Sequence, residues 1–106
     1  FDAVIFVGGT GAATYFNDEY VLDFARKAYE QGKVVAAICI APVILANAGI
    51  LEGKKATVWE SEASRIEAKG ATYTGKDVEV DGRIITAAGP FAAEEFGKAV
   101  VEALKS

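Results

Sequence analysis

The chain has 106 residues, of which 52% are hydrophobic and 25% charged, and it carries a formal net charge of -4 at pH 7. This length and composition predict one globular domain and argue against a disordered chain. The acidic balance, with no local cluster of lysine or arginine, argues against nucleic acid as a partner. No apolar stretch approaches the roughly 18 residues that span a bilayer, and no basic leader precedes an apolar segment, so we expect no membrane partner and a cytoplasmic location.

The first half of the chain alternates expected strands and helices. The apolar run Ala3–Val7 is typical of a strand buried on both faces of a parallel sheet, and the sequence Gly8-Gly9-Thr10-Gly11 follows it. Asp18 is expected to cap a helix that Gly32 ends in a left-handed conformation. The inward stripe of this helix is predicted to be Val21, Ala25, Ala28 and Tyr29. Residues 33–38 form the second predicted buried strand.

The second half begins with a helix opened by Pro42, then a short third strand at residues 55–59 and a charged helix at residues 60–69 ended by Gly70. The apolar period then changes to two around Asp81-Gly82, which is the strongest short hairpin signal in the chain. A closing amphipathic helix carries Ala92, Phe96, Ala99, Val100 and Ala103. Together these elements predict an α/β sandwich with a mostly parallel sheet and one antiparallel hairpin.

The start of the chain leads to a further expectation. The chain has no methionine and begins at Phe1, inside an expected core strand. We therefore expect it to be part of a longer domain. A sheet that lacks its first elements would leave an exposed edge, so we predict a homo-oligomer or pairing with a companion segment that completes the sheet.

Cys39 is the main candidate for chemistry. This single cysteine lies between an expected strand and an expected helix, on a sharp turn that would lift its side chain clear of the sheet. The positive end of the helix would favour a thiolate, which predicts a reactive nucleophile of low pKa. The chain contains no histidine, the usual base for such a thiol. Without histidine, one cysteine cannot build a soft metal site, so we expect no metal ion and no cofactor.

The glycine-rich loop after the first strand has two interpretations. The backbone N–H groups of Gly8 and Gly9 could point at an oxyanion formed near the cysteine sulfur. The loop could instead cradle a dinucleotide, but Thr14 stands where the third glycine of that motif belongs, and the next strand ends in Cys39 rather than an acidic residue. A plain tight turn is the simplest alternative.

The region after the third expected strand contains the only tryptophan, Trp59. We expect its ring to be a buried core aromatic, with closure over the site as the alternative. The charged residues that follow are predicted to form a solvated helix face, namely Glu60, Glu62, Arg65, Glu67 and Lys69.

Several short segments occur in an order that supports a family resemblance. They are Phe1-Asp2-Ala3-Val4 through Gly8-Gly9, Ala36-Ala37-Ile38-Cys39 with Pro42, Gly53-Lys54-Lys55-Ala56-Thr57, Val80-Asp81-Gly82, Ile85-Thr86, Gly89-Pro90 and Glu95-Phe96. With these segments the chain resembles the ThiJ/PfpI superfamily along nearly its whole length. The resemblance implies a flavodoxin-like three-layer sandwich, in which residues 1–106 are a single, partial domain without the N-terminal elements of the family.

The resemblance also implies that Cys39 is the nucleophile on an elbow. The family carboxylate that hydrogen-bonds the cysteine sulfur belongs to the N-terminal part that this chain lacks. The family histidine stands either directly after the cysteine, where this chain has Ile40, or on the strand after the Gly-Lys-Lys segment, where it has Trp59. The common arginine before Gly-Pro is replaced by Ala88. The implied site therefore consists of Cys39, the elbow backbone at Ile40 and the turn at Gly8 and Gly9.

The implied activity is peptidase, glyoxalase or deglycase chemistry of a cysteine-dependent hydrolase, with a small carbonyl compound or a peptide as substrate. Loss of a general base typically costs about 100 to 10,000-fold in rate, so we expect an impaired enzyme. The alternative is a non-catalytic module. In that case Cys39 would be oxidised as a stress signal, or the fold would serve as a chaperone or an assembly surface.

Overall fold

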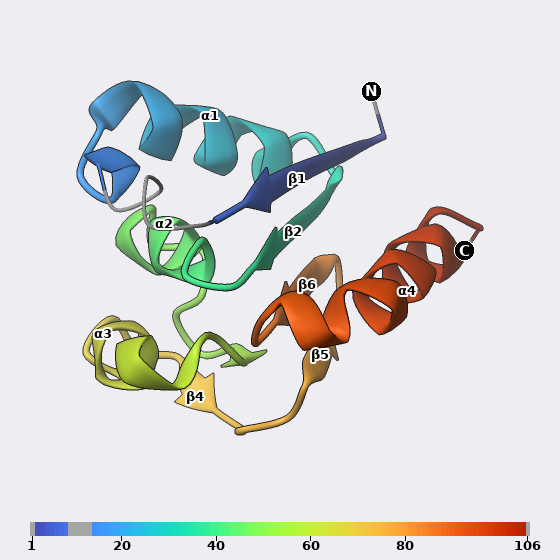
Figure 1. Ribbon diagram of the computed structural model, residues 1–106. Helices are drawn as coiled ribbons and strands as arrows, with labels where there is room; N and C mark the ends of the chain where they lie inside the picture. Colours follow the sequence, from blue (N-terminus) through green and yellow to red (C-terminus); the bar gives the residue numbers. More distant parts are fainter. Residues whose placement is uncertain (1, 9–13, 106) are drawn as a thin grey trace.

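The computed structural model of the chain describes residues 2–8 and 14–105, which alternate between strands and helices (Figure 1). The strands are β1 (Ala3–Val7), β2 (Val34–Ile38), β3 (Lys55–Ala56), β4 (Thr72–Tyr73), β5 (Val78–Asp81) and β6 (Ile84–Ala87). The helices are α1 (Glu19–Glu30), α2 (Pro42–Asn47), α3 (Ala63–Glu67) and α4 (Ala93–Lys105), with the short 3-10 turns η2 (Glu60–Glu62) and η3 (Pro90–Ala92). Within these described ranges, no helix is long and apolar enough to cross a membrane.

The main sheet contains four strands in the order β1-β2-β6-β5. The first three run parallel, with Ala3 opposite Val34 and Val35 opposite Ile84. The strand β5 is antiparallel to β6, and the turn between them contains Gly82 with a φ of 62°. The predicted mostly parallel sheet with one hairpin is therefore confirmed.

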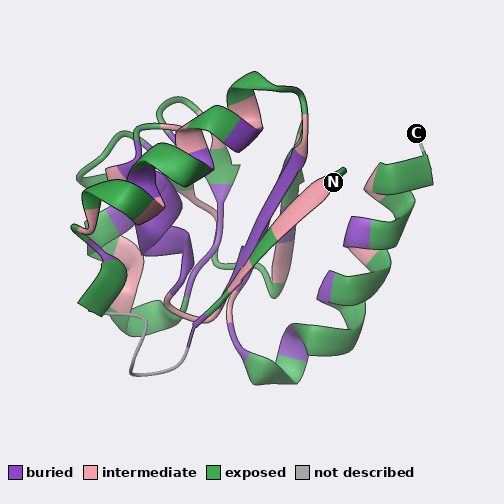
Figure 2. Ribbon diagram, turned by 90° about the horizontal axis from the view of Figure 1, so that it is seen from above, coloured by how far each residue is buried: buried purple, intermediate pink, exposed green. Residues whose placement is uncertain are grey.

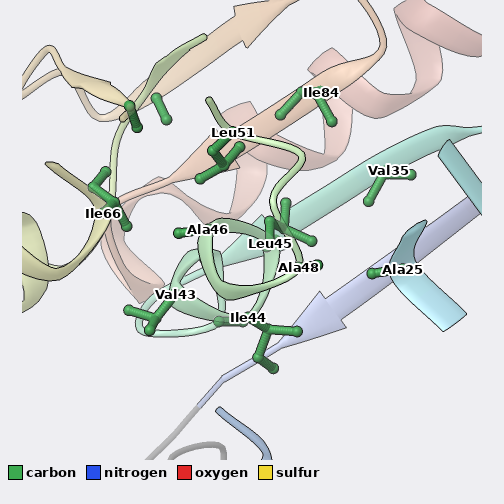
Figure 3. Close-up of a cluster of buried hydrophobic side chains, with 14 of the residues drawn as sticks. Ala25, Val35, Val43, Ile44, Leu45, Ala46, Ala48, Leu51, Ile66 and Ile84 are labelled. Atoms are coloured by element: carbon green, nitrogen blue, oxygen red, sulfur yellow. The ribbon is translucent and has the colours of Figure 1, made fainter. Parts of the chain in front are cut away.

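Helices lie on both faces of this sheet, which gives the three layers expected from the family resemblance. Figure 2 shows α1 and α2 on one side and α4 on the other. Successive residues of a strand point to opposite faces, and β2 is buried on both. Val35 joins the apolar cluster beneath α1 and α2 (Figure 3), whereas Ala36 joins the cluster beneath α4. A continuous apolar run is what such a central parallel strand requires.

The boundaries of α1 agree with the signals read from the sequence. The Oδ1 atom of Asp18 accepts hydrogen bonds from the N–H groups of Tyr20 at 2.9 Å and Val21 at 3.3 Å. After the helix, Gly32 has a φ of 82°, a conformation that costs glycine little. The predicted cap and the predicted left-handed stop are both confirmed.

The strand β1 differs from its expectation. It lies at the edge of the main sheet, and Ile5 and Val7 are 48% and 78% exposed. The prediction of a strand buried on both faces is therefore wrong for the described residues. An apolar strand is buried only where other elements cover it, and of the described strands only β2 pairs with β1.

The third predicted strand is shorter than expected. Only Lys55–Ala56 is a strand, and it pairs with β4 in a separate two-stranded sheet. The N–H of Thr57 instead donates to Oγ1 of Thr86 at 2.9 Å, and the N–H of Trp59 donates to the carbonyl oxygen of Cys39 at 2.9 Å. Because the N–H groups of Thr57 and Trp59 bond to a side chain and to a turn rather than to a neighbouring strand, β3 ends at Ala56. The charged helix expected after it is divided into η2 and α3.

Gly8 follows β1 and lies directly against the turn that follows β2. An ideal Cβ on Gly8 would stand 2.7 Å from the backbone nitrogen of Ala41 and 3.2 Å from the carbonyl oxygen of Ile38. Both atoms belong to the backbone around Cys39, so they cannot move aside without deforming that turn. The missing side chain at Gly8 therefore permits the close approach of two strand ends.

Replacing Gly8 with alanine is expected to lower the free energy of unfolding by about 1–3 kcal/mol, because the new methyl group overpacks the turn. Urea unfolding followed by circular dichroism measures the change. The matched control is Gly97→Ala in α4, where nothing lies within 4 Å of an ideal Cβ. That variant is expected to gain about 0.5–1 kcal/mol from helix propensity. A Gly8→Ala chain as stable as the parent would contradict the close packing.

Candidate active site

The backbone of Cys39 forms the sharp strand-to-helix turn that the sequence predicts. Its φ of 66° is the one positive value among the described non-glycine residues. Such a conformation costs of order 1–3 kcal/mol and persists only where the surroundings hold it in place. Here the N–H of Cys39 donates to the carbonyl oxygen of Ala87 at 3.0 Å, and its carbonyl oxygen accepts from the N–H of Trp59 at 2.9 Å. The turn is therefore fastened to β6 on one side and to the segment after β3 on the other.

The side chain of Cys39 is half-buried and packs against the apolar cluster beneath α4. This burial raises the pKa of the Cys39 thiol above its ordinary value, because an apolar environment disfavours the thiolate. Burial therefore opposes the low pKa that the sequence predicts for this thiol. The helix α2 begins only at Pro42 and has six residues, and no hydrogen bond from the described part of the chain reaches Sγ to offset the burial.

The other predicted site residues have different placements. Gly8 is buried against the turn of Cys39, and its role in binding an oxyanion stays a prediction. Gly9 lies outside the described residues, as do Thr10 and Gly11 of the alternative dinucleotide loop. Ile40 is half-buried and packs against the cluster beneath α1 and α2, on the opposite face from Cys39. Its contribution to the elbow is a carbonyl oxygen that accepts the N–H of Val43 at 3.1 Å.

Trp59 is not the buried core aromatic that the sequence predicts. It is 43% exposed, and its ring centroid lies 6.5 Å from that of Phe91, which is 66% exposed. An ideal Cβ on Gly89 would come within 2.8 Å of both rings, so the absence of a side chain there lets the two rings converge. The fold brings these residues together from two segments far apart in the sequence.

A cavity of about 260 Å³ opens beside this aromatic pair. The described residues that line it are Val58, Trp59, Glu60, Tyr73, Gly75, Asp77, Ala88 and Phe91. The hydrogen bond between Trp59 and Cys39 joins its wall to the elbow. Sequence reasoning missed this cavity because it assigned Glu60 to a solvated helix face, and no local signal connects residues near position 59 with residues near positions 77 and 91.

Comparison with known proteins places the chain in a family. The model of the DJ-1/PfpI family matches residues 1–103. The uncharacterised protein MJ0967 of Methanocaldococcus jannaschii is 43% identical over 106 residues, which cover 97% of this chain and 52% of the relative. The deglycase PfpI of Pyrococcus furiosus is 31% identical over 105 residues, which cover 99% of this chain and 63% of the relative.

A solved structure supports the same placement. The ThiJ/PfpI domain protein from Brachyspira murdochii superposes with a TM-score of 0.97 and 38% sequence identity, covering 99% of this chain and 61% of that protein. The chain therefore spans between half and two-thirds of the length of these relatives. The match to the family model extends over nearly all of the sequence, and we conclude that the chain belongs to the DJ-1/PfpI family.

Proposed function

We propose that the chain performs cysteine-dependent chemistry on small carbonyl compounds or peptides, with Cys39 as the nucleophile. The observation that carries the proposal is the left-handed backbone of Cys39, held by hydrogen bonds from both sides. Strained residues of this kind gather at active sites. The similarity to a deglycase supports a reaction at a carbonyl group.

In the proposed reaction, Sγ of the Cys39 thiolate attacks the carbonyl carbon of an aldehyde such as methylglyoxal. A carbon–sulfur bond forms, and the electron pair of the C=O bond moves onto oxygen, which takes a proton from water to give a thiohemiacetal. Backbone N–H groups at Gly8 and Gly9 would stabilise the oxyanion. The position of Gly8 against the elbow supports this role.

Turnover of methylglyoxal would further require a proton shift from C1 to C2 of the adduct, which gives a lactoyl thioester, and hydrolysis by water, which breaks the carbon–sulfur bond and releases lactate and the thiol. With a peptide substrate, the tetrahedral adduct would break its C–N bond, the amine leaving with a proton from water, and water would hydrolyse the resulting acyl-enzyme to the free acid and the thiol.

The reaction is expected to be slow because the chain supplies no histidine. A general base contributes about 100 to 10,000-fold to the rate of such reactions. The two positions implied for a family histidine carry Ile40, which packs into the core, and Trp59, whose ring cannot accept a proton. The absence of a histidine base also supports a second candidate function. In this function a peroxide converts the Cys39 thiolate to a sulfenic acid without turnover.

The pH dependence of Cys39 alkylation provides the first test. We expect the rate with iodoacetamide to rise with pH around a midpoint above that of free cysteine, because burial raises the pKa of the thiol and only the thiolate reacts. Mass spectrometry of the modified chain measures the rate. The chain unfolded in urea is the control, and its midpoint should fall to the ordinary value. A folded midpoint below that of the unfolded chain would contradict the effect of burial.

A turnover assay separates the two functions. Consumption of methylglyoxal should exceed one equivalent per chain and should be abolished in Cys39→Ala, whereas Glu30→Gln, at the exposed C-terminal end of α1, should retain it. If methylglyoxal is not consumed but mild peroxide adds one oxygen atom at Cys39, the sensor function holds instead. If the chain shows no turnover of methylglyoxal and no oxidation at Cys39, both candidate functions are contradicted.

We also propose that the chain self-associates or pairs with a companion segment along β1. The exposed side chains of Ile5 and Val7 on this edge strand support the proposal, since an uncovered apolar edge favours pairing. Sedimentation velocity is expected to show a species larger than the monomer. An Ile5→Lys, Val7→Lys double variant should shift the distribution toward the monomer. A monodisperse, folded monomer of the unmodified chain would contradict the proposal.

A further inference from the structure

The cavity beside Trp59 combines aromatic rings with acidic side chains. The rings of Trp59, Tyr73 and Phe91 line it, and the carboxylates of Glu60 and Asp77 belong to the same lining. Among the described residues that line the cavity, none is basic. Aromatic faces attract cations through their quadrupole, and carboxylates attract them by charge. This composition favours a positively charged ligand over a neutral or anionic one.

Two basic side chains close to the cavity residues along the sequence, those of Lys76 and Arg65, are paired with other carboxylates. The Nζ atom of Lys76 lies 3.9 Å from Oε1 of Glu79, which is 8% exposed. The Nε atom of Arg65 lies 3.4 Å from Oε2 of Glu62. Glu60 and Asp77 have no such ion pair among the described residues. Their negative charge therefore remains to attract a ligand.

Hydrogen bonds hold the walls of the cavity in place. Trp59 is fastened to the elbow through the carbonyl oxygen of Cys39. On the facing wall, the carbonyl oxygen of Asp77 accepts the N–H of Ala88 at 2.9 Å. Between the walls, Gly89 leaves room for the two rings to converge, since a Cβ there would meet both at 2.8 Å. The cavity is thus formed before any ligand arrives, which reduces the entropic cost of binding.

We propose that this cavity binds a small organic cation, with its alkylammonium group beside the paired rings of Trp59 and Phe91 and near Glu60 and Asp77. A volume of about 260 Å³ suits a ligand of a few heavy atoms rather than a folded partner. The hydrogen bond from the N–H of Trp59 to the carbonyl oxygen of Cys39 connects the cavity wall to the elbow, and the cation would be one end of a substrate that extends toward Cys39. That last role rests on the proposed function, whereas binding itself does not.

Trp59 is the single tryptophan of the chain, so its fluorescence reports directly on the cavity. Choline is the probe, and 3,3-dimethyl-1-butanol, which has the same shape without the charge, is its neutral counterpart. At constant ionic strength, choline should change the emission and saturate, and the neutral alcohol should bind at least about tenfold more weakly, the size of effect expected for cation–π contact and a nearby carboxylate.

Charge variants test the carboxylates without changing the shape of the cavity. Glu60→Gln combined with Asp77→Asn should weaken choline binding about three- to tenfold and leave the affinity for the neutral alcohol unchanged. The control is Glu30→Gln, which removes one of the two negative charges that the double variant removes, but at the exposed end of α1, and it should bind choline like the parent. Circular dichroism confirms that each variant is folded.

Binding and chemistry are measured separately. Choline titrations of Cys39→Ala should match those of the parent, so a failure of thiol chemistry leaves this result intact. Equal affinity for choline and the alcohol would overturn the proposal, because the cavity would then be merely apolar. No response to millimolar choline, in fluorescence and in calorimetry, would also overturn it, as would undiminished choline binding in the double variant.

Discussion

The site depends on one strained residue, Cys39, whose left-handed backbone turns the chain from the central strand into α2. Hydrogen bonds that the parallel register of the sheet makes possible offset the strain of this conformation. Because β2 pairs with β6, the N–H of Cys39 meets the carbonyl oxygen of Ala87, and the segment after β3 returns to bond its carbonyl oxygen. On the other side of β2, Gly8 at the end of β1 fits against the same turn without a side chain. The ends of three segments thus converge on one backbone position.

The packing that stabilises this turn also determines the chemistry of its thiol. Apolar burial beneath α4 raises the pKa of Cys39, whereas an efficient nucleophile needs a stabilised thiolate. The chain has no histidine to provide that stabilisation. A formed elbow with a weakly acidic thiol is consistent with slow chemistry and with reaction toward strong electrophiles.

The elbow and the cavity beside Trp59 are connected by a backbone hydrogen bond. The elbow holds the thiol, and the cavity lined by Trp59, Phe91 and two carboxylates lies beyond the hydrogen bond from Trp59 to Cys39. In this chain a tryptophan occupies a position that the family resemblance associates with histidine. A tryptophan ring cannot accept a proton as histidine can, and here it adds an aromatic ring to the lining of the cavity.

Local physics made much of the fold predictable from the sequence alone. The cap at Asp18 and the hairpin around Gly82 each depend on a few neighbouring residues, and both are present. The place of the turn at Cys39 follows from the strand before it and Pro42 after it, although distant segments hold its backbone. Contacts between distant segments decided the rest. Glu79 is buried while Val80 is 49% exposed, because the packing around β5, not the hydropathy of its residues, determines which side faces inward. Contacts between distant segments also decide the exposure of Val7 and Trp59 and the raised pKa of Cys39. They likewise form the cavity lined by aromatic and acidic residues. The sequence determined which turn carries the thiol, whereas only the tertiary structure decided what surrounds it, since burial and charge at a site are properties of neighbours that the chain brings together by folding.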